Sequence, residues 1–274
     1  MSLSIQQIYQ RVNKYFMKPI IVAYPRSGSE IVTDIVHNYT KQVWQSERCL
    51  QEFLLITFIR DNDFKFVDNK IEGNYWNIPK SEWAVQWNKI KDNFHDQLNE
   101  RISWLKQNPN YVFKLITNPR VSSDAYNWCL NNYHCVFIKR KDKIRSFLSY
   151  FFIPYTGLHY SIDSEQISKD TKIFFNKEQA DTWIWNFKKF NELYAQSNNK
   201  SLLVYEDILV NNSVNETKVL EALGWPIPEN YQHYEYVTRP TPYEDKDILN
   251  YFTNKEAVLD FISKHDDVFN QTEF

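Results

Sequence analysis

The sequence predicts a single α/β domain over residues 1–274, with a mainly parallel central sheet flanked by helices. Short β-branched apolar runs alternate with longer stretches of helical spacing, which is the pattern of strands joined by crossover helices. No internal repeat or low-complexity linker divides the chain. A chain of 274 residues can bury roughly 75% of its unfolded surface, so it needs no disulfide or metal to fold. In such folds ligands bind at the carboxyl ends of the strands.

The first half of the chain contains a predicted strand–turn–helix unit. Pro19 to Tyr24 is an apolar run typical of a buried strand, and Ser29 to Tyr39 has apolar residues at helical spacing. Ser81 to Gln107 is a long amphipathic stretch, which predicts a helix. A second strand is expected over Tyr111 to Thr117.

The second half continues the alternation. The expected elements are a helix over Ser122 to Asn131, a strand over Cys135 to Ile138, a helix over Lys141 to Phe152, a helix over Lys177 to Gln196, a strand over Ser201 to Tyr205 and a helix over Glu216 to Leu223. Either Ser122 or Ser123 is expected to cap the first of these helices, and Gly224 to end the last.

Composition excludes several classes of protein. The formal net charge is −2, from 32 basic and 34 acidic residues, so no overall nucleic-acid footprint is present and any anion site is local. The amino terminus lacks the features of a secretory signal, and no run of about 18 apolar residues predicts a membrane span. Three cysteines without metal-ligand spacing fit a reduced protein, and we expect a cytoplasmic location.

A candidate anion site lies between the first strand and its helix. Gly28 allows a tight turn, Ser27 and Ser29 add hydroxyl donors, and Arg26 supplies a charged fork for phosphate or sulfate oxygens. The helix amino terminus adds unpaired N–H groups and the positive end of a dipole. The alternative is an ordinary surface turn. The Gly-Lys-Ser/Thr pattern of an ATP-binding P-loop is absent.

A second cluster of basic residues follows the strand over Cys135 to Ile138. Arg140 leaves this strand, and Ser149 lies nine residues later on the predicted helix, so both side chains can reach one anion. The neighbouring basic residues are Lys139, Lys141, Lys143 and Arg145. A solvated basic face is the alternative explanation.

These motifs resemble those of sulfotransferases that use 3′-phosphoadenosine 5′-phosphosulfate (PAPS). Tyr24 to Ser29 resembles their 5′-phosphosulfate loop, and Arg140 with Ser149 resembles their 3′-phosphate motif, in a spacing more like that of the bacterial trehalose sulfotransferases. Val204 to Leu209 resembles their Tyr-Glu-Asp-Leu strand end, which implies that Tyr205 lies near the nucleotide. The matching segments occur in order between about residue 19 and residue 226.

The resemblance implies a P-loop-like sulfotransferase fold and transfer of a sulfuryl group from PAPS to a hydroxyl of a carbohydrate or small metabolite. It implies that Arg26 and the loop N–H groups stabilise the leaving phosphate, with no metal. One departure is Glu30, an acid where the family usually has Thr, Asn or Ser.

The general base is the open part of this prediction. Members of the cytosolic type use a His after the second strand, but this chain reads Lys114-Leu115-Ile116-Thr117 there. By resemblance to the trehalose type, Glu52 is the expected base, and His159 is a second candidate. Two rival functions remain, a P-loop-like nucleotide kinase and a catalytically inactive protein that binds a nucleotide or sugar.

Overall fold

The computed structural model describes residues 18–43, 99, 102–103, 105–107, 112–119, 121–152, 172–210, 213–233 and 248–270, together with the backbone of residues 49–50, 65–67 and 70–72. The predicted helix over Ser81 to Gln107 lies mostly outside these residues.

A five-stranded sheet with the order β2-β5-β1-β6-β7 forms the centre of the fold, and every neighbouring pair in it is parallel. Its strands are β1 (Pro19–Ala23), β2 (Cys49–Leu50), β5 (Val112–Ile116), β6 (His134–Lys139) and β7 (Lys200–Val204). All residues of β1 and β5 are buried, as expected of strands covered on both faces. The predicted α/β class with a parallel sheet is therefore confirmed.

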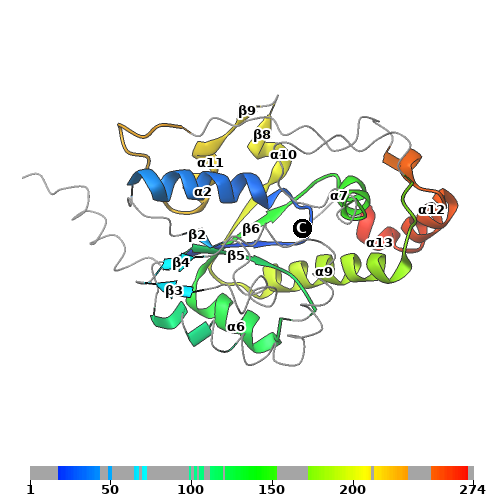
Figure 1. Ribbon diagram of the computed structural model, residues 1–274, viewed down its shortest axis with the longest axis horizontal. Coiled ribbons are helices and arrows are strands. Elements are labelled where there is room, and N and C mark those ends of the chain that lie inside the picture. The colour runs from blue at the N-terminus through cyan, green and yellow to red at the C-terminus, as the bar shows by residue number, and fades with distance from the viewer. Residues whose placement is uncertain are drawn as a thin grey trace, which may run out of the picture.

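Helices cover both faces of the sheet (Figure 1). On one face, α2 (Ser29–Val43) and α11 (Glu216–Ala222) pack into an apolar cluster with β1. On the other, α6 (Ser123–Asn132) and α9 (Lys177–Gln196) contribute to a larger cluster rich in aromatic rings. The apolar stripes predicted from the sequence are the faces that these helices bury.

Side-chain caps set several helix ends. Ser122 accepts from the Ala125 N–H at the start of α6, so Ser122 rather than Ser123 is the cap. Asp142 caps α7 (Lys143–Tyr150), which explains why this helix begins two residues later than predicted. At the end of α11, Gly224 has a φ of 71° and donates its N–H to the Glu221 carbonyl, as predicted for a terminating glycine.

Several short elements were not predicted. Strands β3 (Lys65–Val67) and β4 (Lys70–Glu72) form an antiparallel pair, and so do β8 (Leu209–Val210) and β9 (Ser213–Val214). Tyr205, predicted to end a strand, instead begins α10 (Tyr205–Ile208).

The carboxyl-terminal segment supports α7. It comprises the 3-10 helix η4 (Ile248–Tyr251) and the helices α12 (Lys255–Lys264) and α13 (Asp266–Phe269). Phe147 of α7 stacks on Phe261 with ring centroids 5.6 Å apart and meets Phe269 edge-on at 5.2 Å. These rings bury Phe147 and hold α7 against the carboxyl-terminal helices.

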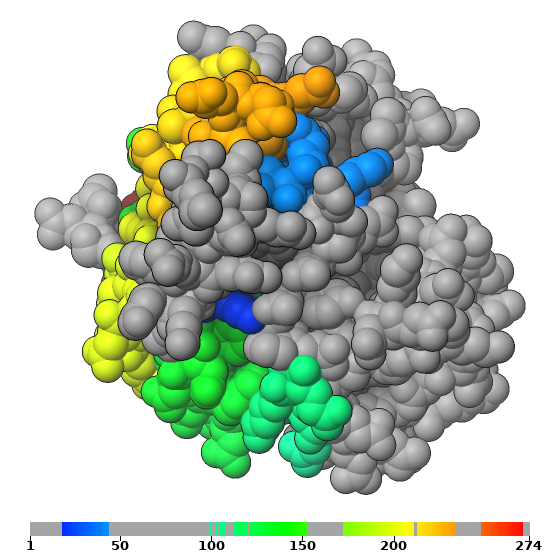
Figure 2. Space-filling view, turned by 90° about the vertical axis from the view of Figure 1, so that its left-hand side faces the viewer, coloured from blue at the N-terminus to red at the C-terminus, as the bar shows by residue number. Residues whose placement is uncertain are grey.

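The two ends of the sheet differ in what they expose. The carboxyl ends of β1, β6 and β7 meet the starts of α2, α7 and α10 (Figure 1). Figure 2 looks at the opposite end, where the segment that follows α11, in orange, lies beside the end of α2, in light blue. Within the described ranges, no helix is long and apolar enough to cross a membrane.

Candidate anion-binding site

The loop between β1 and α2 has the backbone shape of an anion cradle. Arg26 and Gly28 both have positive φ angles, of 67° and 91°, and the Ser27 N–H donates to the Tyr24 carbonyl over 3.2 Å. Turns that alternate in this way, followed by the free N–H groups of a helix start, form concave anion-binding sites. A positive φ at an arginine costs conformational energy, which is typical of functional loops.

Hydrogen bonds from two helices hold the loop backbone in place. Trp183 of α9 donates its indole N–H to the Pro25 carbonyl over 3.3 Å, and Ser146 of α7 donates its hydroxyl to the Arg26 carbonyl over 3.1 Å. Both donors belong to buried side chains. The loop is therefore fixed by the core rather than by solvent-exposed contacts.

Three predicted site residues meet in one stack. Gly28 lies so close to Tyr205 that an added Cβ would stand 2.0 Å from the ring carbon Cδ2. The Arg140 guanidinium lies over the same ring, 4.7 Å from its centroid. The structure thus brings together residues from the ends of β1, β6 and β7, as the parallel topology predicts.

Ser149 lies beside Arg26. The Arg26 Nε donates to the Ser149 hydroxyl over 3.3 Å, and that hydroxyl donates to the Ser146 carbonyl over 2.9 Å. The sequence paired Ser149 with Arg140 at one anion. The structure joins Ser149 to the arginine of the β1–α2 loop, and its pairing with Arg140 at an anion stays a prediction.

Two buried donors of the site lack hydrogen-bond partners within the described part of the chain. They are the Ser27 hydroxyl and the Arg140 Nε, which is 3.7 Å from the Glu206 carboxylate in a long ion pair. Leaving a buried donor unsatisfied costs about 1–3 kcal/mol. Phosphate groups bound at this end of the sheet would offer acceptors to these donors.

Two backbone N–H groups of the segment after β6 form hydrogen bonds to side chains of neighbouring elements. The Arg140 N–H donates to the Tyr24 hydroxyl over 3.0 Å, and the Lys141 N–H donates to Glu206 over 2.8 Å. Burial raises the pKa of Tyr24 well above its ordinary value, although the bond from Arg140 acts in the opposite direction. The Tyr24 hydroxyl therefore stays neutral and orients the start of this segment.

Three lysines, Lys139, Lys141 and Lys143, surround Arg140 in the sequence and place several positive charges close together. Burial, and secondarily the charge of Lys141, lower the pKa of Lys139. Burial and the charge of Lys139 likewise lower the pKa of Lys143. Lys141 is different, because its ammonium is exposed and bonds to Asp207 over 2.7 Å. An anion at this end of the sheet would relieve the repulsion among these charges.

Glu30, which departs from the pattern of the sulfotransferase loop, forms an ion pair. Its carboxylate pairs with Lys114 of β5, whose side chain is fully buried. No sequence pattern indicated that these two residues pair, because they are 84 positions apart.

The position after β5, where some sulfotransferases carry a His, holds no acid–base group. Thr117 is buried and donates its hydroxyl to the Asn186 carbonyl over 2.9 Å. The two predicted bases, Glu52 and His159, lie outside the described residues.

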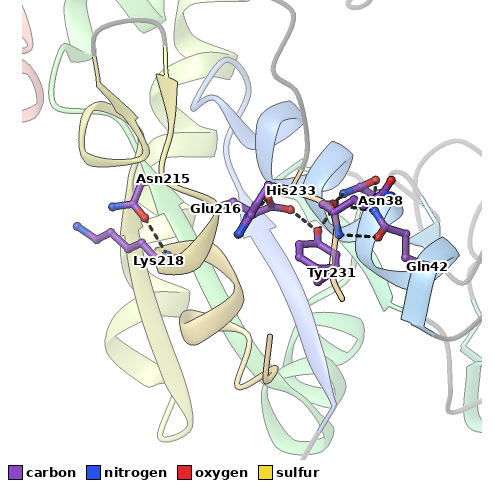
Figure 3. Close-up of polar contacts among 8 residues, drawn as sticks. Asn38, Gln42, Asn215, Glu216, Lys218, Tyr231 and His233 are labelled. Carbon is purple, nitrogen blue, oxygen red and sulfur yellow. Dashed lines mark hydrogen bonds and ion pairs between the residues drawn. The ribbon is translucent and has the colours of Figure 1, made fainter. Parts of the chain in front are cut away.

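A polar cluster missed by the sequence analysis joins α11 to α2 (Figure 3). The Tyr231 hydroxyl donates to Glu216 and accepts from Asn38 over 2.9 Å, while His233 Nδ1 is 2.9 Å from the second Glu216 oxygen. Burial, and then the nearby Glu216, raise the pKa of Tyr231. The cluster holds the segment after α11 against the second half of α2, away from the β1–α2 loop.

Comparisons of the chain with models of protein families, with curated proteins and with solved structures each found no match. The functional assignment therefore depends on the sequence motifs and on the arrangement of the site.

Proposed function

We propose that the protein is a PAPS-dependent sulfotransferase with a P-loop-like sulfotransferase fold, acting on a hydroxyl of a carbohydrate or small metabolite. The observation that carries the proposal is the pair of buried donors, Ser27 and Arg140, which lack partners among the described residues at the place where the sequence predicts two phosphates. The proposal is further supported by the Gly28–Tyr205–Arg140 stack, which joins the two predicted halves of the site.

Each residue has a role that its surroundings favour. The β1–α2 loop, with Ser27, Gly28 and Ser29, would hold the 5′-phosphosulfate by its backbone N–H groups and hydroxyls. Arg26 would neutralise charge that develops on the leaving phosphate. Arg140 and Ser149 would hold the 3′-phosphate, with Ser149 also orienting Arg26.

The nucleotide and the reaction follow from these roles. Tyr205, packed on Gly28, would present its ring to the nucleotide. Sulfuryl transfer then requires in-line placement of the acceptor hydroxyl and neutralisation of the leaving group, as in phosphoryl transfer. The cations of the site supply that neutralisation without a metal.

Calorimetry and a transfer assay test the proposal together. Adenosine 3′,5′-bisphosphate should bind more tightly than AMP, and radiolabel from PAPS should pass to a hydroxyl in a fraction of cell metabolites. Tight binding of ATP with Mg²⁺ but not of the bisphosphate would indicate a nucleotide kinase instead. Bisphosphate binding without transfer to any acceptor or to water would indicate an inactive binding protein.

A further inference from the structure

An ion pair lies beneath the first turn of α2, directly after the proposed phosphosulfate loop. Glu30 is the second residue of α2, two positions after Gly28, and its Oε1 contacts the Lys114 ammonium from β5. The Lys114 side chain is 0% exposed and that of Glu30 is 24% exposed. The second carboxylate oxygen, Glu30 Oε2, is buried and has no hydrogen-bond partner within the described part of the chain.

Packing alone does not account for this pair. The surrounding contact between α2 and the sheet is apolar, formed by residues such as Ile21, Ile31 and Val112. Removing two charges from water costs several kcal/mol per ion, so an apolar pair at these positions would serve stability as well or better. A buried carboxylate oxygen without a donor adds a further cost. A ligand that donates a proton to Glu30 Oε2 would remove that cost.

The position of Glu30 fits the acceptor side of the reaction. If the loop holds the 5′-phosphosulfate, the first turn of α2, which carries Glu30, lies next to the transferring group, and the hydroxyl that attacks the sulfur has to lose a proton there. Two other polar side chains among the described residues at this end of the sheet are already bonded. Thr117 bonds a backbone carbonyl, and Glu206 accepts the Lys141 and Asp142 N–H groups.

We propose that Glu30 is the general base of the sulfuryl transfer, taking this role from Glu52 and His159, and that Lys114 is the positioning residue that fixes its carboxylate. The assignment rests on the proposed function. In the step, the acceptor oxygen forms a bond to sulfur, and the bond from sulfur to the 5′-phosphate oxygen breaks with its electron pair going to adenosine 3′,5′-bisphosphate. The hydroxyl proton moves to Glu30 Oε2.

The test compares acceptors that differ in their need for a base. The protein is supplied with radiolabelled PAPS and water alone, with trehalose, or with p-nitrophenol in mildly alkaline buffer, where this phenol is already ionised. Water is always present, so release of sulfate from PAPS gives a rate whatever the natural acceptor is. Binding of adenosine 3′,5′-bisphosphate is measured in parallel by calorimetry.

Glu30→Gln keeps the shape of the side chain and removes the base. Transfer to water and to trehalose should fall about 10²–10⁴-fold, while transfer to p-nitrophenolate and bisphosphate affinity change less than about tenfold. Glu256→Gln is the matched control, because Glu256 is the exposed second residue of α12, and this variant should leave all rates unchanged.

The single variant removes the carboxylate charge that pairs with the buried Lys114 ammonium, so it can lose the fold. The double variant Glu30→Gln with Lys114→Met removes both charges and keeps the test open. Its folding is checked by circular dichroism, and its rates on water and on p-nitrophenolate should show the same selective loss.

The outcomes distinguish an error in the assignment of Glu30 from an error in the proposed function. Equal losses on all acceptors, or no loss on any, in folded variants overturn the assignment of Glu30 while the sulfotransferase proposal stands. A selective loss in Glu52→Gln or His159→Ala, and not in Glu30→Gln, gives the role back to that residue. A wild-type protein that neither binds the bisphosphate nor consumes PAPS overturns the proposed function and this assignment with it.

Discussion

Replacing Gly28 by alanine perturbs the contact on which the two halves of the site depend. Gly28 has a φ of 91°, and a Cβ at this position would stand 2.0, 2.8 and 2.7 Å from the Tyr205 atoms Cδ2, Cγ and Cε2. Atoms at such distances overlap, so the Tyr205 ring has to move. The Arg140 guanidinium, 4.7 Å from the ring centroid, would then lose its cation–π contact with this ring.

The size of the effect has two parts. A left-handed backbone costs an alanine about 1–2 kcal/mol relative to glycine. Forcing a packed ring aside costs a further 1–3 kcal/mol, about the range found for overpacked sites. Gly28→Ala should therefore destabilise the protein by about 2–5 kcal/mol and also weaken binding of adenosine 3′,5′-bisphosphate.

Gly224→Ala is the matched control. Gly224 also has a positive φ, of 71°, but an added Cβ there meets nothing within 4 Å, so only the backbone part applies. Thermal and urea unfolding give the stability of both variants, and calorimetry gives their bisphosphate affinity. The double variant Gly28→Ala with Tyr205→Ala should recover the steric part of the stability but not the binding.

Equal destabilisation by Gly28→Ala and Gly224→Ala would refute the reasoning, because it would mean that the ring of Tyr205 does not press on the loop. So would an unchanged bisphosphate affinity in a folded Gly28→Ala protein that transfers sulfate normally.

Three further predictions concern charge and burial. Arg26→Ala should lower transfer by about 10²–10³ while changing donor affinity less, and Arg26→Lys should recover part of the rate, both measured with radiolabelled PAPS. Arg140→Ala should abolish the preference for adenosine 3′,5′-bisphosphate over AMP, a loss of about ten- to a hundredfold by calorimetry. Lys141→Ala is its control, because Lys141 only joins an exposed ion pair and should have little effect. Burial raises the pKa of Cys129 and raises that of Cys135 to about 12, so neither thiol should react with iodoacetamide at neutral pH until the protein unfolds; peptide mapping that finds either one labelled in the folded protein would contradict this.

Elements that are long and periodic could be predicted from the sequence. The helix over Lys177 to Gln196 was predicted with the bounds that α9 has, because its apolar stripe runs through the whole segment and its cap, Asn176, directly precedes it. The strands β1 and β6 were predicted to within one residue at each end, because each is a continuous apolar run. The convergence of Gly28, Arg140 and Tyr205 was also predictable, since carboxyl ends of parallel strands share one edge of a sheet.

Features that depend on tertiary contacts were not predictable in this way. The single turn α10 is too short to be stable alone and forms where Tyr205 packs on the loop. The Glu30–Lys114 pair and the bond from Arg26 to Ser149 join residues 84 and 123 positions apart. No local pattern encodes such a pairing.

The position of β1 in the strand order affects how the protein is made. This strand is the earliest in the described part of the chain, yet it lies between β5 and β6, so both of its partners are synthesised much later. Until residue 116 has left the ribosome, β1 has neither partner strand, and until residue 139 has left it one edge of this apolar strand remains open to chaperones or to aggregation. The loop that follows β1 acquires its supports from α7 and α9 later still, so a nascent chain that stops short of α9 carries an anion loop that nothing yet holds in shape.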